Sequence, residues 1–197
     1  MIQSYQAAAD YSDEMVGRLL DELDKTGRRE NTIIVLWSDH GYHLGDKTAC
    51  VKFTLWEKAN HVPFIVVVPG ITQPGSVCDR PVSLLDIYPT LVELAGLSEK
   101  PELDGQSLVP LLKHPERDWQ RPALMTQLRG NHAIKTQTHR YIRYEDGTEE
   151  LYTDADNWNI NSLAKKPELA SVLKQHRALM DKALANLRSG WTHEKSM

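Results

Sequence analysis

Apolar residues recur at helical spacing near the start of the chain, which predicts an amphipathic helix over residues 5–23. Its apolar positions are Tyr5, Ala8, Met15, Val16, Leu19, Leu20 and Leu23. Gly27 lies just beyond them, and Lys25 and Arg28 beside it suit the negative end of a helix dipole. We therefore expect the helix to end next to Gly27.

Two short apolar runs follow, residues 33–37 and 64–70, both rich in β-branched side chains. Continuous runs of this kind are typical of strands that are covered on both faces. A long polar loop separates them, and residues 86–97 then predict a helix with Asp86 as its cap. Helix, strand, loop, strand and helix in this order indicate an open α/β sheet, of which two strands are only a part.

The pattern changes after residues 98–122, an irregular stretch rich in proline, leucine and charge. Four short strands are predicted next, at residues 123–127, 132–137, 140–145 and 149–153. Asp146-Gly147 is a hairpin turn signal between the last two, and residues 167–188 form a final amphipathic helix. We expect a small antiparallel sheet with a C-terminal helix, and His132 and Arg140 on its surface.

Composition excludes few classes of protein but argues against two kinds of partner. The 197 residues are 41% hydrophobic and 25% charged, with a net charge of -4, so we expect no nucleic-acid partner. No apolar stretch approaches the ~20 residues of a membrane helix, so we expect no membrane partner. The first residues lack the basic flank and apolar core of a signal peptide, which leaves the compartment open. Cys50 and Cys78 fit two unpaired thiols.

The first predicted strand runs directly into Ser38-Asp39-His40-Gly41. In open α/β sheets, ligands bind beyond the carboxyl ends of the strands. Adjacent Asp39 and His40 can both reach one divalent ion there, because a carboxylate supplies oxygen and an imidazole supplies nitrogen. Gly41 lets the backbone turn and approach a ligand closely. The pattern thus indicates a candidate metal site.

Residues 38–70 read SDHGYHLGDKTACVKFTLWEKANHVPFIVVVPG. This stretch resembles the sulfatase family of the alkaline phosphatase superfamily, especially its iduronate-2-sulfatase-like members. The shared pattern is S-D-H-G, L-G-[ED]-x, a spacer, a lysine with an aromatic residue, V-P-[LF]-I and P-G. Two later stretches, VSLLDIYPTLVELAGL and RYIRYEDGTEELY, also look like elements of this family. The resemblance implies a partial alkaline-phosphatase-like α/β domain over residues 1–122 and a small C-terminal subdomain over residues 123–197.

The resemblance also implies roles for single residues. Asp39 and His40 match the family's second pair of ligands to a divalent ion, usually calcium. Lys52 matches the lysine that contacts the sulfate, and a fixed ammonium would stabilise negative charge on the departing oxygen. Neighbouring candidates for contacts to a sulfate-ester substrate, a sulfated carbohydrate or an aryl sulfate, are Tyr42, His43 and Phe53.

The chain departs from the family pattern in two ways. Ala49-Cys50 stands where relatives often have His-Trp, which leaves the substrate open. The family's nucleophile, a cysteine or serine oxidised to formylglycine within C/S-x-P-x-R, has no match, and neither has the first metal pair, Asp-Asp. We therefore expect the C-terminal half of a sulfatase, inactive alone, with a metal site that can be empty. It would self-associate or join a missing N-terminal half.

Two alternatives stay open at this point. A phosphodiesterase or phosphonate hydrolase of the same superfamily also uses Asp-His-Gly for metal-dependent chemistry, although Lys52 and the L-G-D-K sequence favour sulfate. A non-catalytic α/β module that binds an ion or a partner is the other, because the nucleophile segment is absent from these residues.

Overall fold

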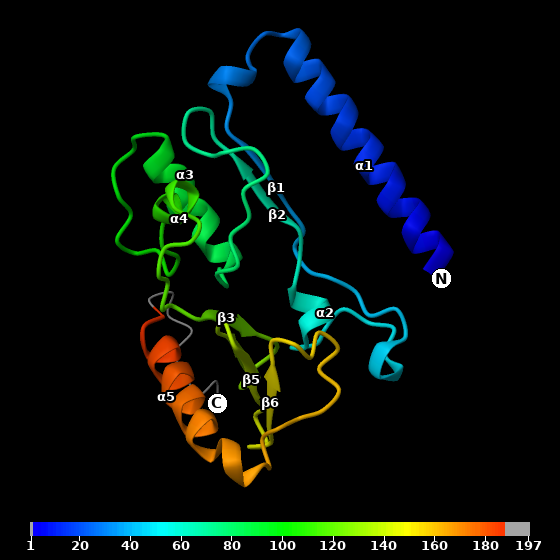
Figure 1. The fold of residues 1–197 in the computed structure, drawn as a ribbon, viewed down its shortest axis with the longest axis vertical. Coiled ribbons are helices and arrows are strands. Elements are labelled where there is room, and N and C mark those ends of the chain that lie inside the picture. The colour runs from blue at the N-terminus through cyan, green and yellow to red at the C-terminus, as the bar shows by residue number, and fades with distance from the viewer. Residues whose placement is uncertain (1, 188–197) are drawn as a thin grey trace, which may run out of the picture.

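The computed structural model describes residues 2–187, in which helices accompany two separate antiparallel sheets (Figure 1). The first helix, α1 (Ile2–Lys25), contains the helix predicted over residues 5–23. It stands away from the rest of the molecule, and none of its residues is buried (Figure 1). On its apolar stripe, Tyr5 and Leu19 are 46% and 71% exposed while Met15 and Val16 are half-buried, so the described residues cover this stripe only in part.

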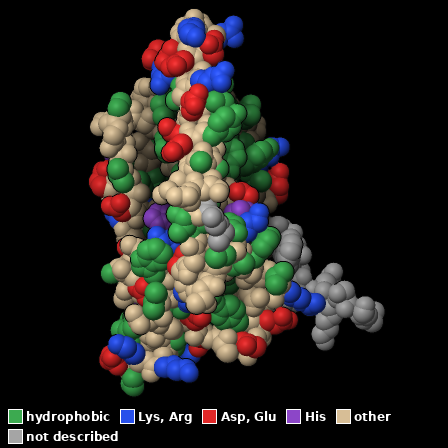
Figure 2. Space-filling model, turned by 90° about the vertical axis from the view of Figure 1, so that its right-hand side faces the viewer, with side chains coloured by type: hydrophobic (Ala, Val, Ile, Leu, Met, Phe, Trp, Pro, Cys, Tyr) green, Lys and Arg blue, Asp and Glu red, His purple; other side chains and the backbone are tan. Residues whose placement is uncertain are grey.

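The first sheet has only two strands, β1 (Ile34–Trp37) and β2 (Phe64–Val67), paired antiparallel. We predicted strands covered on both faces, and this is wrong for the described part of the chain. The side chains of Leu36, Ile65 and Val67 share one face and are all exposed. Figure 2 shows hydrophobic side chains gathered beside the α1 ridge. The face stays open because a two-stranded sheet buries little without a covering layer.

The short helix η3 (Leu84–Asp86) leads directly into the next longer helix, α3 (Ile87–Leu94). Ser83, rather than the predicted Asp86, caps this unit, and Asp86 completes a capping box from the third position. The Asp86 carboxylate is fully buried, accepts hydrogen bonds from two backbone N–H groups and pairs with Arg121. It therefore ties the irregular stretch 98–122, which contains α4 (Val109–Lys113), to this helical unit.

The second sheet confirms the small antiparallel sheet expected after residue 122. Its strands lie in chain order: β3 (Ala123–Thr126), β4 (His132–Lys135), β5 (His139–Arg143) and β6 (Glu149–Thr153). The predicted Asp146-Gly147 turn closes the last hairpin, with Gly147 at φ 82°. The final helix, α5 (Ala170–Ala185), follows η4 (Pro167–Leu169), and the predicted end at Arg188 lies outside the described residues.

Strand alternation gives this sheet two buried faces. One face packs against α5, and its core consists of Ile134, Tyr141, Leu151, Leu173 and Met180. The opposite face packs against the chain just before α2 (Glu57–Asn60), through Leu55, Ala133, Ile142 and Tyr152. The small sheet thus packs between α5 and the chain that leads into α2.

The predicted boundary between residues 122 and 123 stays a prediction.

Among the described helices, none combines the length and the apolar character needed to cross a membrane.

Candidate functional site

The candidate site lies in residues 38–56, which we call the site loop; it joins β1 to α2 and includes η2 (Asp46–Thr48). Backbone hydrogen bonds fold its start onto the chain around α2. Ser38 N–H donates to the Pro63 carbonyl at 3.2 Å, and Gly41 N–H donates to the Ala59 carbonyl at 2.9 Å. Asp39 and His40 are therefore held between two fixed points at the end of β1.

Gly41 is required here because of a close backbone approach. A Cβ atom at this position would lie 2.0 Å from the Lys58 carbonyl oxygen, closer than any real contact. Only glycine lets the loop pass α2 at this distance. The sequence predicted that Gly41 lets the backbone approach a ligand closely. In the structure, the close approach is to α2.

Asp39 and His40 bring two donor atoms together. His40 Nε2 lies 3.2 Å from Asp39 Oδ2, and the Asp39 side chain is 81% exposed. His40 Nδ1 lies 3.0 Å from the Gly41 carbonyl oxygen, which can only accept, so Nδ1 carries the proton. His40 Nε2 then faces the Asp39 carboxylate. A carboxylate oxygen and an imidazole nitrogen at this distance can hold one cation between them, either a proton or a metal ion.

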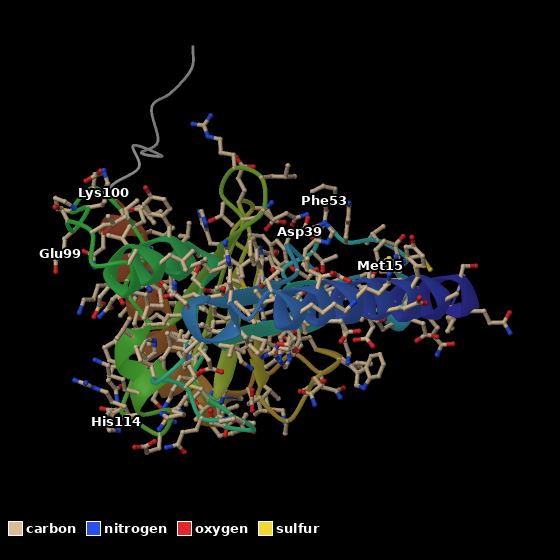
Figure 3. All side chains as sticks on the ribbon, turned by 90° about the horizontal axis from the view of Figure 1, so that it is seen from above. Met15, Asp39, Phe53, Glu99, Lys100 and His114 are labelled. Atoms are coloured by element: carbon tan, nitrogen blue, oxygen red, sulfur yellow. The ribbon has the colours of Figure 1, made fainter. Side chains whose placement is uncertain are left out.

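Lys52 lies further along the site loop, exposed to solvent. Its Nζ is 5.9 Å from the centre of the Phe53 ring, and Phe53 itself is 72% exposed. Within residues 2–187, no carboxylate forms an ion pair with Lys52. The ammonium is therefore available to an anion from outside the described chain. Figure 3 labels Asp39 and Phe53, which both belong to the site loop and lie on the same side of the molecule.

The other two candidates for substrate contacts differ from each other. The Tyr42 hydroxyl donates to the Cys50 carbonyl at 3.0 Å, and its ring lies 6.1 Å from that of Tyr5 on α1. His43 is fully buried, and its ring nitrogens contact the Asp46 carboxylate and, at 2.7 Å, the Thr54 hydroxyl. Because both nitrogens are occupied, His43 organises the loop in this structure instead of presenting an atom to a substrate.

A buried ion pair that the sequence pattern did not predict supports the site loop from the side of the small sheet. Arg140 Nε donates to Glu57 Oε2 at 2.8 Å, and Arg140 Nη1 donates to the Leu55 carbonyl at 3.0 Å. Lys135 lies 3.5 Å from the same carboxylate. Burial acts to raise the pKa of Glu57, but Arg140 and Lys135 outweigh it and hold that pKa below its usual value.

The expected surface position of Arg140 is therefore wrong, since the residue is 2% exposed. Strand alternation was the signal that could have placed it correctly. Residues two apart in a strand share a face, so Arg140 lies on the same face as the buried Ile142. A cation on a buried face indicates a carboxylate partner. His132, also expected on the surface, is half-buried and contacts the Thr126 hydroxyl.

Lys47 is a second anchor that the sequence did not reveal. Its Nζ lies 3.8 Å from the centre of the Trp56 ring and donates to the Asn159 carbonyl at 2.7 Å. Burial lowers the pKa of Lys47, and the Glu150 and Asp156 carboxylates partly offset that effect. Asn159 also accepts a hydrogen bond from the Glu57 N–H, the first residue of α2. Asn159, in the segment after β6, therefore holds both Lys47 in the site loop and the start of α2.

The described residues contain no group of three or more His, Cys, Asp or Glu side chains that could hold a metal ion. Asp39 and His40 therefore form a pair of possible donors without a third such side chain beside them in the described residues. The structure brings these two side chains together, and within residues 2–187 it leaves Lys52 without an ion-pair partner.

Known proteins are similar to this chain in sequence and in fold. Residues 1–97 match the family model described as Sulfatase. A protein named Sulfatase from Formosa agariphila is 41% identical over 187 residues, which are 94% of this chain and 36% of that protein. An ulvan-active sulfatase from the same organism is 33% identical over 199 residues, 94% of this chain and 39% of that protein.

One solved structure, in complex with its substrate D-glucosamine-2-N,6-O-disulfate, superposes with a TM-score of 0.82 at 27% identity. The match covers 93% of this chain and 40% of that one. The family match and the shared fold define the class, the alkaline phosphatase superfamily. The chain belongs to the sulfatase family within it. It spans between 36% and 40% of the length of these relatives, whose family is generally metal-dependent.

Proposed function

We propose that this chain supplies half of the metal shell and the leaving-group lysine of a sulfuric ester hydrolase that acts on sulfated carbohydrates. The observation that carries the proposal is the approach of Asp39 Oδ2 and His40 Nε2 to 3.2 Å at the end of β1. Relatives named sulfatases that match 94% of the chain support the class of reaction. An ulvan-active relative and a structure with a glucosamine disulfate support the class of substrate.

The Asp39–His40 geometry fits a shared divalent ion. Two ligands at about 2.3 Å from an ion and at a right angle are about 3.2 Å apart. Calcium, the ion we propose, would there polarise the sulfate oxygens as a Lewis acid. The contribution of this chain is to orient the His40 ring through the Gly41 carbonyl, which leaves Nε2 facing Asp39.

Two protein ligands are too few for tight binding, because calcium prefers six to eight oxygens. We therefore expect titration calorimetry on the purified chain to show a Kd on the order of 1 mM or weaker. Tight calcium binding that Asp39→Asn abolishes would show a complete site in these residues and would contradict the half-shell proposal.

Lys52 has the charge and exposure of a leaving-group partner. Cleavage of the C–O–S linkage places negative charge on the departing oxygen, and a fixed ammonium stabilises that charge. Lys52 forms no ion pair within residues 2–187, so its positive charge is not already neutralised. We propose that the ammonium donates a hydrogen bond to this oxygen.

The test is to coexpress the chain with the part of the 41%-identical Formosa sulfatase that this chain does not match, and to compare 4-nitrophenyl sulfate with 4-nitrophenyl phosphate. We expect sulfate hydrolysis that falls about 100-fold or more in Lys52→Ala. A preference for the phosphate ester would favour a phosphodiesterase or phosphonate hydrolase. Calcium-independent saccharide binding without turnover would favour the non-catalytic module.

A further inference from the structure

The turn between β3 and β4 contacts Phe53, the residue after Lys52. Gln127 Nε2 donates to the Phe53 carbonyl at 2.6 Å, a bond between segments 74 positions apart in the sequence. Arg129 is two residues beyond Gln127, and Lys52 is one residue before Phe53. The view in Figure 3 places Phe53 and this turn on the same side of the molecule. We call Lys52, Phe53, Leu128 and Arg129 together the turn surface.

The backbone of the turn is strained in a way that a solvent-facing connection does not need. Leu128 has φ 58°, in the left-handed region that bulky side chains rarely adopt, and its side chain is 74% exposed. Gly130, at φ 77°, packs against the Glu145 side chain, and Asn131 accepts the Glu145 N–H at 2.9 Å. The neighbouring hairpin thus fixes the conformation that projects Leu128. Strain of this kind gathers where a protein clamps a ligand.

The charges of the turn surface are also unmatched. Across the described residues, Arg129 and Lys52 form no ion pair with a carboxylate, whereas the arginines of β5 and α5 do. Arg140 pairs with Glu57, Arg143 with Asp181, and Arg177 with Glu149. Each of these cations has an exposed apolar neighbour in the sequence, Phe53 after Lys52 and Leu128 before Arg129. This combination suits a ligand that alternates anionic groups with the apolar faces of rings.

We propose that the turn surface binds the sugar unit next to the one whose sulfate ester lies at Lys52, with Arg129 on an anionic group of that unit. This inference rests on the proposed function and extends it from a single sulfated sugar to a sulfated oligosaccharide. The Arg129 guanidinium binds a sulfate or carboxylate through two parallel hydrogen bonds. Leu128 and Phe53 cover the apolar face of the ring.

The experiment compares two probes on the full chain by titration calorimetry: a heparin-derived tetrasaccharide and D-glucosamine-2-N,6-O-disulfate. We expect Arg129→Gln to weaken the tetrasaccharide about fivefold to tenfold and to leave the monosaccharide unchanged, because only the longer ligand reaches the turn. Arg28→Gln, which removes an exposed arginine three positions after the last residue of α1, is the matched control and should change neither affinity. Figure 1 shows this end of α1 far from β3.

Leu128→Gly separates binding from folding. Glycine adopts positive φ without strain, so the variant should unfold at a higher temperature than the native chain, yet bind the tetrasaccharide about twofold to threefold more weakly. A purely structural turn would show higher stability with unchanged binding, which would overturn the proposal.

The outcomes distinguish this inference from the proposed function. If Lys52→Gln weakens both probes and Arg129→Gln weakens neither, the turn surface is wrong and the proposed function stands. If Arg129→Gln weakens only the tetrasaccharide while Lys52→Gln changes nothing, the turn surface stands and the role of Lys52 is wrong. Failure of the native chain to bind the tetrasaccharide would overturn the turn surface, whereas the proposed function is decided separately by sulfate hydrolysis in the coexpressed enzyme.

Discussion

Gly41 sets how closely the site loop passes α2, and its substitution tests that approach. We expect Gly41→Ala to destabilise the chain by about 1–3 kcal/mol, because the new methyl group meets the Lys58 carbonyl and the backbone has to move. Urea unfolding followed by circular dichroism measures the change.

The matched control for that substitution is Gly17→Ala in α1, where a Cβ has no neighbour within 4 Å. Alanine should stabilise this helix position by about 0.5–1 kcal/mol. Destabilisation of equal size at both glycines would show that the loop does not pass α2 as closely as described.

The Glu57–Arg140 pair predicts a specific dependence of stability on pH. Glu57→Gln leaves Arg140 buried without its counter-charge and should cost about 3–5 kcal/mol at pH 7. The pKa of Glu57 is lower in the folded chain than its usual 4.5, so its contribution is complete above pH 4.5. It is lost as the pH falls through the folded value, and the difference between native and variant chains should shrink there.

Unfolding free energies measured from pH 7 down to pH 3 check this prediction. Glu99→Gln, an exposed carboxylate, is the control and should cost less than about 0.5 kcal/mol throughout. A gap between the native chain and Glu57→Gln that stayed constant or grew on acidification would contradict the assigned ion pair.

At the scale of elements, two long helices have opposite relations to the core. Met180 of α5 is completely buried against the small sheet, whereas Leu19 of α1 is 71% exposed. We expect Met180→Ala to cost about 2–5 kcal/mol, because it removes buried methylene groups and leaves a cavity. Leu19→Ala should change stability by less than about 0.5 kcal/mol. Denaturant midpoints measure both, and similar costs would mean that α1 packs in solution.

Over the whole molecule, apolar surface is exposed on two elements that follow each other in the chain. These are the exposed part of the α1 stripe and the open face of β1 and β2. Large apolar patches drive association, so we expect the chain to form dimers or larger species at micromolar concentration. The double substitution Ile65→Lys with Val67→Lys places two like charges on this face and should shift the chain toward monomer.

Light scattering over a range of concentrations measures this shift in mass. Val77→Lys is the control, because Val77 is 75% exposed but lies outside the two-stranded sheet. A native chain that stays monomeric at all concentrations would show that the open face does not associate.

Local patterns determined the elements, since hydrophobic periodicity and turn residues act over a few positions. The three longer helices, the strands, the Asp146-Gly147 turn and the family resemblance of residues 38–70 were predictable in this way, whereas the short helices α2 and α4 were not. So was the position of Asp39 and His40 at the end of a strand.

Only the tertiary structure decided which residues meet across long separations. Glu57 and Arg140 are 83 positions apart, and Lys47 and Asn159 are 112 apart. The burial of His43 and the contact of Gly41 with α2 likewise depend on neighbours that folding brings together. A single sequence contains no local signal for such pairs, because the energy of a contact depends on which surfaces the packed elements bring into reach.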